Sequence, residues 1–175
     1  PVYARSSVFH VPRVSRRVSE GVAEYEIERK FLLSALPRMP DPVDVFEIDQ
    51  GYLPGTRLVE RLRRQCDRSG HTRYYRTVKI GVGVQRMELE EETDVKTFEH
   101  LWLLTDGRRL RKRRYVVPQS DRYWEVDEFL DRELVLAEME IPTVETEITV
   151  PEWLRQVLVR DITGERKFTN RSLAR

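Results

Sequence analysis

The stretch that decides the fold is EYEIERKFLL, residues 24–33. Read with the two-residue period of a β-strand, it has one charged face and one largely apolar face. The charged face holds Glu24, Glu26, Glu28 and Lys30, and the other face holds Tyr25, Ile27, Arg29 and Phe31. Carboxylates about 7 Å apart along one face of a strand repel one another. Either this face is open to water, where the repulsion costs little, or something cationic belongs beside it.

The composition excludes several classes of protein. The chain has 175 residues, of which 39% are hydrophobic and 35% are charged. No apolar run approaches the ~20 residues that span a bilayer, so we expect no membrane association. The 31 basic residues nearly balance the 30 acidic ones, and the net charge of +1 predicts no general attraction to nucleic acid. What matters is therefore how the two signs are sorted in space.

Cysteine content and the N-terminal residues indicate the compartment. The single cysteine, Cys66, allows no intramolecular disulfide and favours a cytoplasmic location. The N-terminus does not resemble a signal peptide, because Arg16 and Glu20 interrupt any apolar region. We predict a basic N-terminal extension over residues 1–22 and one domain over 23–175. The extension either touches an anionic partner or, as we favour, packs loosely on the domain.

Glycine and proline residues divide the remaining chain into stretches of alternating pattern. These predict eight strands, at 23–33, 46–53, 57–66, 72–80, 85–93, 108–118, 121–130 and 134–141. An apolar stripe with a 3.6-residue period predicts one helix at 94–104. A second helix is expected to start at Pro151, and the ending TNRSLAR to form a short helix. This content predicts a mostly β fold, an antiparallel sheet that could close into an eight-stranded barrel.

In strand after strand, one face is polar and the other apolar. The polar face holds Glu26, Glu28, Lys30, Arg61, Arg63, Thr77, Lys79, Glu88, Glu90, Glu125, Asp127, Glu138 and Glu140. One interpretation is a solvated face on which Glu–Arg pairs contribute about 0.2–1 kcal/mol each. Two features favour a different interpretation. A solvated face usually contains Ser, Thr, Gln and Lys, whereas these residues are nearly all Glu, Asp or Arg, and they cluster by sign.

Turned inward in a closed barrel, these side chains would line a lumen with acidic and basic walls. Clustered carboxylates provide the hard oxygen ligands that suit Mg²⁺ or Mn²⁺. Converging Arg and Lys side chains suit phosphate oxygens. The pattern therefore indicates a site for a polyanion bridged to a divalent cation, and that metal ion would be the cation that the first strand lacks.

At this point the chain resembles the CYTH superfamily, the triphosphate tunnel metalloenzymes. The run Glu26-x-Glu28-x-Lys30 is similar to the signature of that family. Similar segments follow in the family's order: IDQGYL (48–53), ERLRR (60–64), TVK (77–79), RMELEEE (86–92), LRKRRY (110–115), WEVDEF (124–129), LAEMEI (136–141) and KFTNRSLA (167–174). The resemblance covers residues 24–174. It implies a closed eight-stranded antiparallel barrel, a CYTH-like tunnel domain at 23–175, whose lumen binds a triphosphate and a divalent metal.

The resemblance also implies an activity and a site. The most similar members are short bacterial triphosphatases that hydrolyse inorganic tripolyphosphate with a metal ion, here Mg²⁺ or Mn²⁺. The implied triphosphate ligands are Lys30, Arg61, Arg63, Lys79, Lys112, Arg114 and, with less support, Arg166. The implied metal ligands are Glu26, Glu28, Glu88, Glu90, Asp127, Glu138 and Glu140. Lys30, Lys79 and Glu28 are the implied catalytic residues, and no catalytic role is expected for His10, His71 or His100.

Other functions stay open. Relatives hydrolyse thiamine triphosphate or cyclise ATP, as adenylate cyclases do, and a noncatalytic module that binds polyphosphate or nucleotides would use the same cations. Thiamine triphosphate would call for an aromatic platform, for which Trp153 is a candidate, although a tryptophan beside a proline more often serves packing. A panel of triphosphate substrates would separate these hypotheses.

Two positions depart from the family pattern. Arg113 stands where a small polar residue is common, and Glu128 where an apolar residue is usual. Alternation points Arg109, Arg111 and Arg113 outward, away from the predicted site. This strip is either a nucleic-acid patch or, as we favour, a solvated face or subunit contact that leaves a homodimer open. No aromatic residues interleave with the arginines for base stacking, so we expect no nucleic-acid partner.

Overall fold

A computed structural model describes the backbone of residues 25–41, 43–56, 58–80 and 85–175, and their side chains except at 25, 26, 80 and 85–87. The strands are β1 Tyr25–Leu33, β2 Asp44–Tyr52, β3 Val59–Asp67, β4 Thr72–Ile80, β5 Gln85–Glu92, β6 Arg109–Gln119, β7 Arg122–Phe129, β8 Val135–Ile141 and β9 Leu158–Asp161. The helical segments are α1 Val95–Trp102, η1 Leu103–Thr105, α2 Glu152–Arg155, η2 Arg166–Phe168 and α3 Asn170–Leu173. The predicted basic extension at 1–22 lies outside the described residues.

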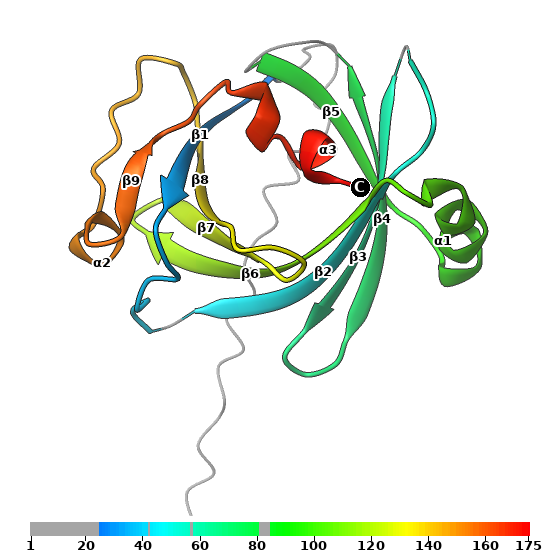
Figure 1. Ribbon diagram of the computed structural model, residues 1–175, viewed down its shortest axis with the longest axis horizontal. Helices are drawn as coiled ribbons and strands as arrows, with labels where there is room; N and C mark the ends of the chain where they lie inside the picture. Colours follow the sequence, from blue (N-terminus) through cyan, green and yellow to red (C-terminus); the bar gives the residue numbers. More distant parts are fainter. Residues whose placement is uncertain (1–24, 42, 57, 81–84) are drawn as a thin grey trace, which may run out of the picture.

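The strands pair in a single antiparallel sheet. Within the described residues it has nine strands in the order β5-β4-β3-β2-β6-β7-β8-β1-β9. The first strand also pairs with β5, from Tyr25 opposite Met87 to Ile27 opposite Gln85. Figure 1 shows the sheet curving so that α3 and the C-terminus lie within its curve in this view. The prediction of a mostly β, antiparallel fold with few helices is confirmed.

The apolar face of β1, β6, β7 and β8 carries the main core. Its buried residues are Ile27, Phe31, Leu33, Val117, Trp124, Val126, Ala137, Met139, Ile141 and Leu154. The rings of Phe31 and Trp124 pack at 5.6 Å between centroids. Burying each such large side chain contributes about 1.5–3 kcal/mol. The segment that carries α2 covers this face, with Trp153 packed partly buried against the core, so Trp153 has a packing role in this fold.

A second apolar cluster occupies part of the opposite, inner face. It joins Leu110, Phe129 and Leu136 of three strands with Ile162 and Leu173 from the C-terminal segment. The backbone of the last residue exchanges hydrogen bonds with that of Arg109 at 3.0 and 3.3 Å, which fixes α3 against β6. The C-terminal segment therefore covers the apolar part of the inner face, and the charged part lies beside it.

Helix α1 packs on the outer side of β3 and β4. Asp94 caps its N-terminus by accepting a hydrogen bond from Thr97 N at 2.9 Å. Its buried Phe98 packs on Tyr74 with 4.9 Å between ring centroids. A Cβ at Gly51 would lie 2.7 Å from Thr105 Cβ, so only glycine allows the end of this helical segment to approach β2 so closely.

The predicted helices are found with small differences. The stretch predicted at 94–104 forms α1 and η1, and the short terminal helix is α3, capped by Thr169. Pro151 is the N-cap of α2 rather than its first helical residue. Strand β9 was not predicted. No helix in the described part of the chain is long and apolar enough to cross a membrane.

Candidate active site

The order of the strands sorts the charges of the inner face into two halves. Strands β4, β3, β2 and β6 are consecutive neighbours, and their inward cations are Lys79, Arg61, Arg63, Lys112 and Arg114. Strands β7, β8 and β1, with β5 paired to β1, hold the acids Glu125, Asp127, Glu138, Glu140, Glu28, Glu88 and Glu90. Among the side chains that the structure describes, Lys30 of β1 is the cation within the acidic half. The two halves meet at the β6–β7 and β4–β5 borders.

At the β6–β7 border the ion pairs are deeply buried. The Lys112 ammonium lies 2.5 Å from Asp127 Oδ2, and both residues are 0% exposed. Arg114 donates two hydrogen bonds of 2.7 Å to the same carboxylate, a third to Glu125, and one of 3.3 Å to Glu138. Burial alone would raise the pKa of Asp127, but Arg114 and Lys112 hold it well below its usual range. Asp127 is therefore an anion that two cations stabilise.

At the β4–β5 border one carboxylate holds two arginines. Arg61 Nη2 donates to Thr77 Oγ1 at 3.0 Å and to Glu90 Oε2 at 3.1 Å. Arg63 Nη2 donates to Glu90 Oε1 at 2.8 Å. The buried Thr77 hydroxyl completes the network by donating to Glu90 Oε2 at 2.9 Å. Nearby, Lys79 forms an ion pair with Glu88. Thus both oxygens of Glu90 are used to orient the guanidinium groups.

Two buried donors of the basic half have no acceptor. Within the described residues, the Nε–H groups of Arg61 and Arg63 make no hydrogen bond. The Arg63 guanidinium also lies over the ring of Tyr75, 4.9 Å from its centroid. Burial, with the positive charges of Arg61 and Arg114, lowers the pKa of Arg63 to about 10 against the opposing effect of Glu90. Leaving a buried donor unsatisfied costs about 1–3 kcal/mol. An anion with several oxygen acceptors would satisfy both groups and reduce the repulsion.

The acidic half surrounds one buried lysine. Lys30 Nζ lies 2.8 Å from Glu138 Oε1 and 3.3 Å from Glu28 Oε1. Although burial opposes it, the two carboxylates raise the pKa of Lys30 well above its usual value. Like charges also face each other directly across strands, Glu28 opposite Glu140 and Glu125 opposite Glu138. Such pairs are destabilising unless a cation lies nearby.

The chemistry of these donors fits a hard divalent cation. Among the residues that the structure describes, no three Asp, Glu, His or Cys side chains converge as metal ligands. Glu28, Glu138 and Glu140 lie on adjacent strands and offer the oxygen donors that Mg²⁺ prefers. Within the described residues, the only polar contact of the buried Glu138 Oε1 atom is with the Lys30 ammonium group. The predicted ligand Glu26 has its side chain outside the described residues.

The structure assigns other contacts to two predicted metal ligands. Asp127 uses both oxygens for Lys112 and Arg114, and Glu90 uses both for Arg61 and Arg63. Both carboxylates therefore hold cations of the basic half in place, and their role as metal ligands stays a prediction. Glu88 is likewise engaged by Lys79.

Some residues of the sequence analysis lie apart from this cluster. Arg166 is exposed in η2, and no ion pair joins it to the cluster within the described residues. His71 is exposed in the β3–β4 turn, and His100 Nδ1 lies 2.7 Å from the carbonyl oxygen of Lys96 on α1. His10 lies outside the described residues. The structure thus places the two described histidines away from the charged inner face.

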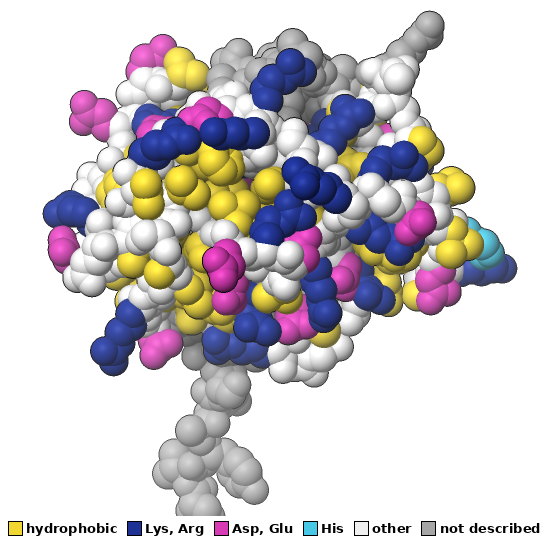
Figure 2. All heavy atoms as spheres, viewed as in Figure 1, with side chains coloured by type: hydrophobic (Ala, Val, Ile, Leu, Met, Phe, Trp, Pro, Cys, Tyr) yellow, Lys and Arg dark blue, Asp and Glu magenta, His cyan; other side chains and the backbone are white. Residues whose placement is uncertain are grey.

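The outer arginine strip is paired with acids of β2. Arg111 and Arg113 lie 3.3 and 3.0 Å from the carboxylate of Glu47. The Arg109 guanidinium stacks over the ring of Trp102, 4.7 Å from its centroid. Figure 2 shows basic and acidic side chains interspersed on the face it presents, rather than a continuous basic patch. Partner acids on the molecule itself thus compensate Arg111 and Arg113.

Three residues of the cluster were not predicted as site residues. Glu125 and Thr77 belong to the charged face by alternation alone, but only their contacts with Arg114 and Arg61 reveal their part in the site. Tyr75 depends on strand register, which places it opposite Arg63 on the neighbouring strand. Alternation places all three on the charged face, whereas the contact of Tyr75 with Arg63 also depends on the strand register.

Comparison with known proteins gives consistent results. No protein-family model matches the chain. The inorganic triphosphatase of Nitrosomonas europaea is 33% identical over 156 residues, which cover 85% of this chain and 96% of the relative. The inorganic triphosphatase of Acetivibrio thermocellus is 30% identical over 154 residues, covering 86% and 93%. The crystal structure of the inorganic triphosphatase NE1496 superposes with a TM-score of 0.60 and 31% identity, covering 85% of this chain and 93% of that one.

Proposed function

Because the chain belongs to the family of the inorganic triphosphatases, we propose that it hydrolyses inorganic triphosphate at the charged inner face of its sheet. The observation that carries this proposal is the pair of buried Nε–H groups of Arg61 and Arg63, which have no acceptor among the residues that the structure describes. They lie in the basic half, where cations from neighbouring strands gather. The chain of phosphoryl groups in triphosphate offers acceptors along its length.

The sheet is proposed to close into a barrel of the CYTH type. The pairing of β1 with β5 supports this, since it joins the two ends of the run from β5 to β1. In such a barrel the basic half would face the acidic half across a tunnel. The C-terminal segment would cover the part of the tunnel wall that carries the second apolar cluster. The proposed triphosphate ligands are Lys30, Arg61, Arg63, Lys79, Lys112 and Arg114, with Arg166 as a further candidate.

Magnesium or manganese is proposed to bind at the acidic half. Glu28, Glu138 and Glu140 would hold the ion, with Glu26 as a further ligand. Glu88, Glu90 and Asp127 are less favoured candidates, because cations of the basic half already contact their carboxylates. When bound, the ion would supply Lewis-acid neutralisation of phosphoryl oxygens.

The protein's own groups contribute mainly positioning and charge. Arg61 and Arg63, oriented by Glu90, would hold the inner phosphoryl groups, and Lys79 would hold oxygens near the same border. Lys30, held beside Glu138, would donate to the terminal phosphoryl group. A water molecule then attacks the terminal phosphorus, and the bridging P–O bond breaks to leave phosphate and pyrophosphate. Glu28, 3.3 Å from the Lys30 ammonium, is the proposed base that accepts the proton of the water.

A panel of substrates tests the proposal. Phosphate release would be measured with Mg²⁺ and with Mn²⁺ on tripolyphosphate, pyrophosphate, ATP and thiamine triphosphate. We expect tripolyphosphate to be used with the highest kcat/KM, and pyrophosphate to be a poor substrate because it is too short to reach both borders. Faster turnover of ATP or thiamine triphosphate would reassign the substrate. Tight tripolyphosphate binding without any release would indicate the noncatalytic module instead.

A further inference from the structure

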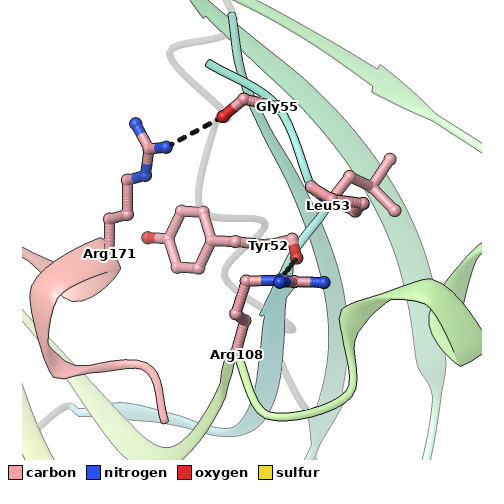
Figure 3. A pocket seen from close by; sticks show the side chains of 6 residues that line it. Tyr52, Leu53, Gly55, Arg108 and Arg171 are labelled. Atoms are coloured by element: carbon pink, nitrogen blue, oxygen red, sulfur yellow. Dashed lines mark hydrogen bonds between the residues drawn. The ribbon is translucent and has the colours of Figure 1, made fainter.

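A second, smaller cluster of cations lies outside the charged inner face. It lines a cavity of about 270 Å³ formed by Tyr52, Leu53, Pro54, Gly55, Arg108 and Arg171. The cavity lies where the segment after β2 faces α3 and the turn before β6. Figure 3 shows the Tyr52 ring between the side chains of Arg108 and Arg171, which approach from these two different segments.

Both arginines are held by backbone carbonyls rather than by carboxylates. Arg108 donates to Tyr52 O at 3.3 Å and to Leu104 O at 3.1 Å. Arg171 donates to Gly55 O at 3.2 Å. Neither guanidinium has an ion-pair partner in the part of the chain that the structure describes. Carbonyl contacts fix the direction of a guanidinium group but leave its charge uncompensated. Each guanidinium has five N–H donors, so donors remain for a ligand.

Several other arginines of the fold are paired with carboxylates instead. Arg111 and Arg113 are paired with Glu47, and Arg114 contacts three carboxylates. Two uncompensated cations that line one small cavity make it electropositive and favour an anion inside it. The cavity has room for a small oxyanion, and the carbonyl contacts hold both forks in place before any ligand binds.

The cavity borders the proposed active site through one side chain. Tyr52 is 4% exposed, belongs to the inner face of β2, and lies directly opposite Arg61 in the strand register. Its carbonyl oxygen is the group that Arg108 holds. Tyr52 forms one wall of the cavity and also neighbours Arg61. The cavity therefore lies next to the basic half, where it could receive an anion that leaves that half.

We propose that the cavity lined by Arg108 and Arg171 is a second anion site that binds inorganic phosphate. The site is separate from the cluster around Arg61, Arg63 and Arg114. The choice of phosphate as the ligand rests on the proposed function, since phosphate is a product of triphosphate hydrolysis. The existence of an oxyanion site rests only on the two uncompensated guanidinium groups and the cavity that they line.

Backbone amide NMR signals of the full chain during phosphate titration test this proposal, without divalent metal and with acetate as the comparison anion. In the wild type, phosphate should shift the signals of Leu53 and Gly55, and acetate should shift them less at equal concentration. Arg108→Gln/Arg171→Gln removes two charges but keeps amide donors. This variant should bind phosphate at the cavity at least roughly ten-fold more weakly, because charge-assisted bonds are lost.

A matched control and a second variant keep the outcome interpretable. Arg73→Gln/Arg155→Gln removes two exposed charges elsewhere and should leave the Gly55 response unchanged. If the double variant at the cavity unfolds, Arg171→Gln alone is expected to weaken the response. Unchanged Gly55 signals in the wild type, or equal responses in the wild type and the folded cavity variant, would overturn the proposal. Failure of triphosphate turnover with a retained Gly55 response would overturn the proposed function but leave the anion site.

Discussion

The ammonium group of Lys112 lies 2.5 Å from the carboxylate of Asp127, and neither residue is exposed to solvent. Arg114 donates two further bonds to the same carboxylate. Burying charges is costly, and these three groups are stable together only because each compensates the others. These contacts identify Asp127 as an acid that stabilises the cations of the inner face. The predicted effects of replacing Asp127 therefore differ from those for other acids on the same face.

Replacing Asp127 should strongly destabilise the fold. Asp127→Asn leaves Lys112 and Arg114 without their shared anion, and breaking a buried pair costs about 3–5 kcal/mol of the free energy of unfolding. Urea denaturation would measure the loss. The control is Glu47→Gln on the outer face, where exposed pairs contribute about 0–1 kcal/mol. An Asp127→Asn protein as stable as the wild type, but with weakened metal binding, would make Asp127 a metal ligand rather than an ion-pair partner.

The same carboxylate predicts a dependence of stability on pH. The pKa of Asp127 is held below its ordinary value of 3.8, so the unfolded chain binds this proton more readily than the folded protein does. The contribution of Asp127 is therefore fully present above that ordinary value and is lost as the pH falls below it. The difference in unfolding free energy between the wild type and Asp127→Asn should shrink as the pH falls from about 5 to 2. A difference that stayed constant over this range would contradict the ionised pair.

Glu140 and Glu138 should respond in opposite ways. Glu140→Gln removes one of two carboxylates that face each other directly across β1 and β8, so the metal-free melting temperature should hold or rise. Glu138→Gln removes the anion 2.8 Å from buried Lys30, so the metal-free melting temperature should fall. The alternating pattern alone does not distinguish the two acids, and the contact with Lys30 sets Glu138 apart. Thermal unfolding in EDTA measures both, and equal destabilisation would contradict the account of Glu140.

Divalent metal should be required for turnover and should stabilise the folded protein. Mg²⁺ or Mn²⁺ is expected to restore activity after EDTA treatment, and Ca²⁺ to support little because it accepts looser coordination than Mg²⁺. A readout independent of turnover is the rise in melting temperature on adding Mg²⁺, which should be smaller in Glu140→Gln than in the wild type. Full turnover in excess EDTA would remove the metal from the proposal.

Alternating patterns and turn residues predicted most of the fold. Eight strand positions and α1 follow from local periodicity, which strand and helix geometry impose directly on the sequence. The four residues of β9, LVRD, are too few to show a period, and their strand forms because they pair with β1. The cover of the inner face by Ile162 and Leu173 is also a tertiary effect that no local pattern carries.

The site was predictable as a face but not as a set of contacts. Alternation places Glu90, Asp127 and Glu138 on one face with the cations. It does not give the register, and register decides that Glu90 meets two arginines while Glu138 meets Lys30. The distinction between acids that hold cations and acids that could hold a metal therefore had to come from the structure.

The central claim is that Arg61 and Arg63 present buried donors to a triphosphate, and calorimetric titration with tripolyphosphate tests it most directly. Each charge-assisted contact contributes roughly 1.5–3 kcal/mol, so Arg61→Ala and Arg63→Ala should each raise Kd about ten-fold to a hundred-fold. Arg111→Ala, a matched change on the outer face, should bind like the wild type. If both inner variants bound tripolyphosphate with the Kd of the wild type while remaining folded, the assignment of the substrate to this face would be wrong.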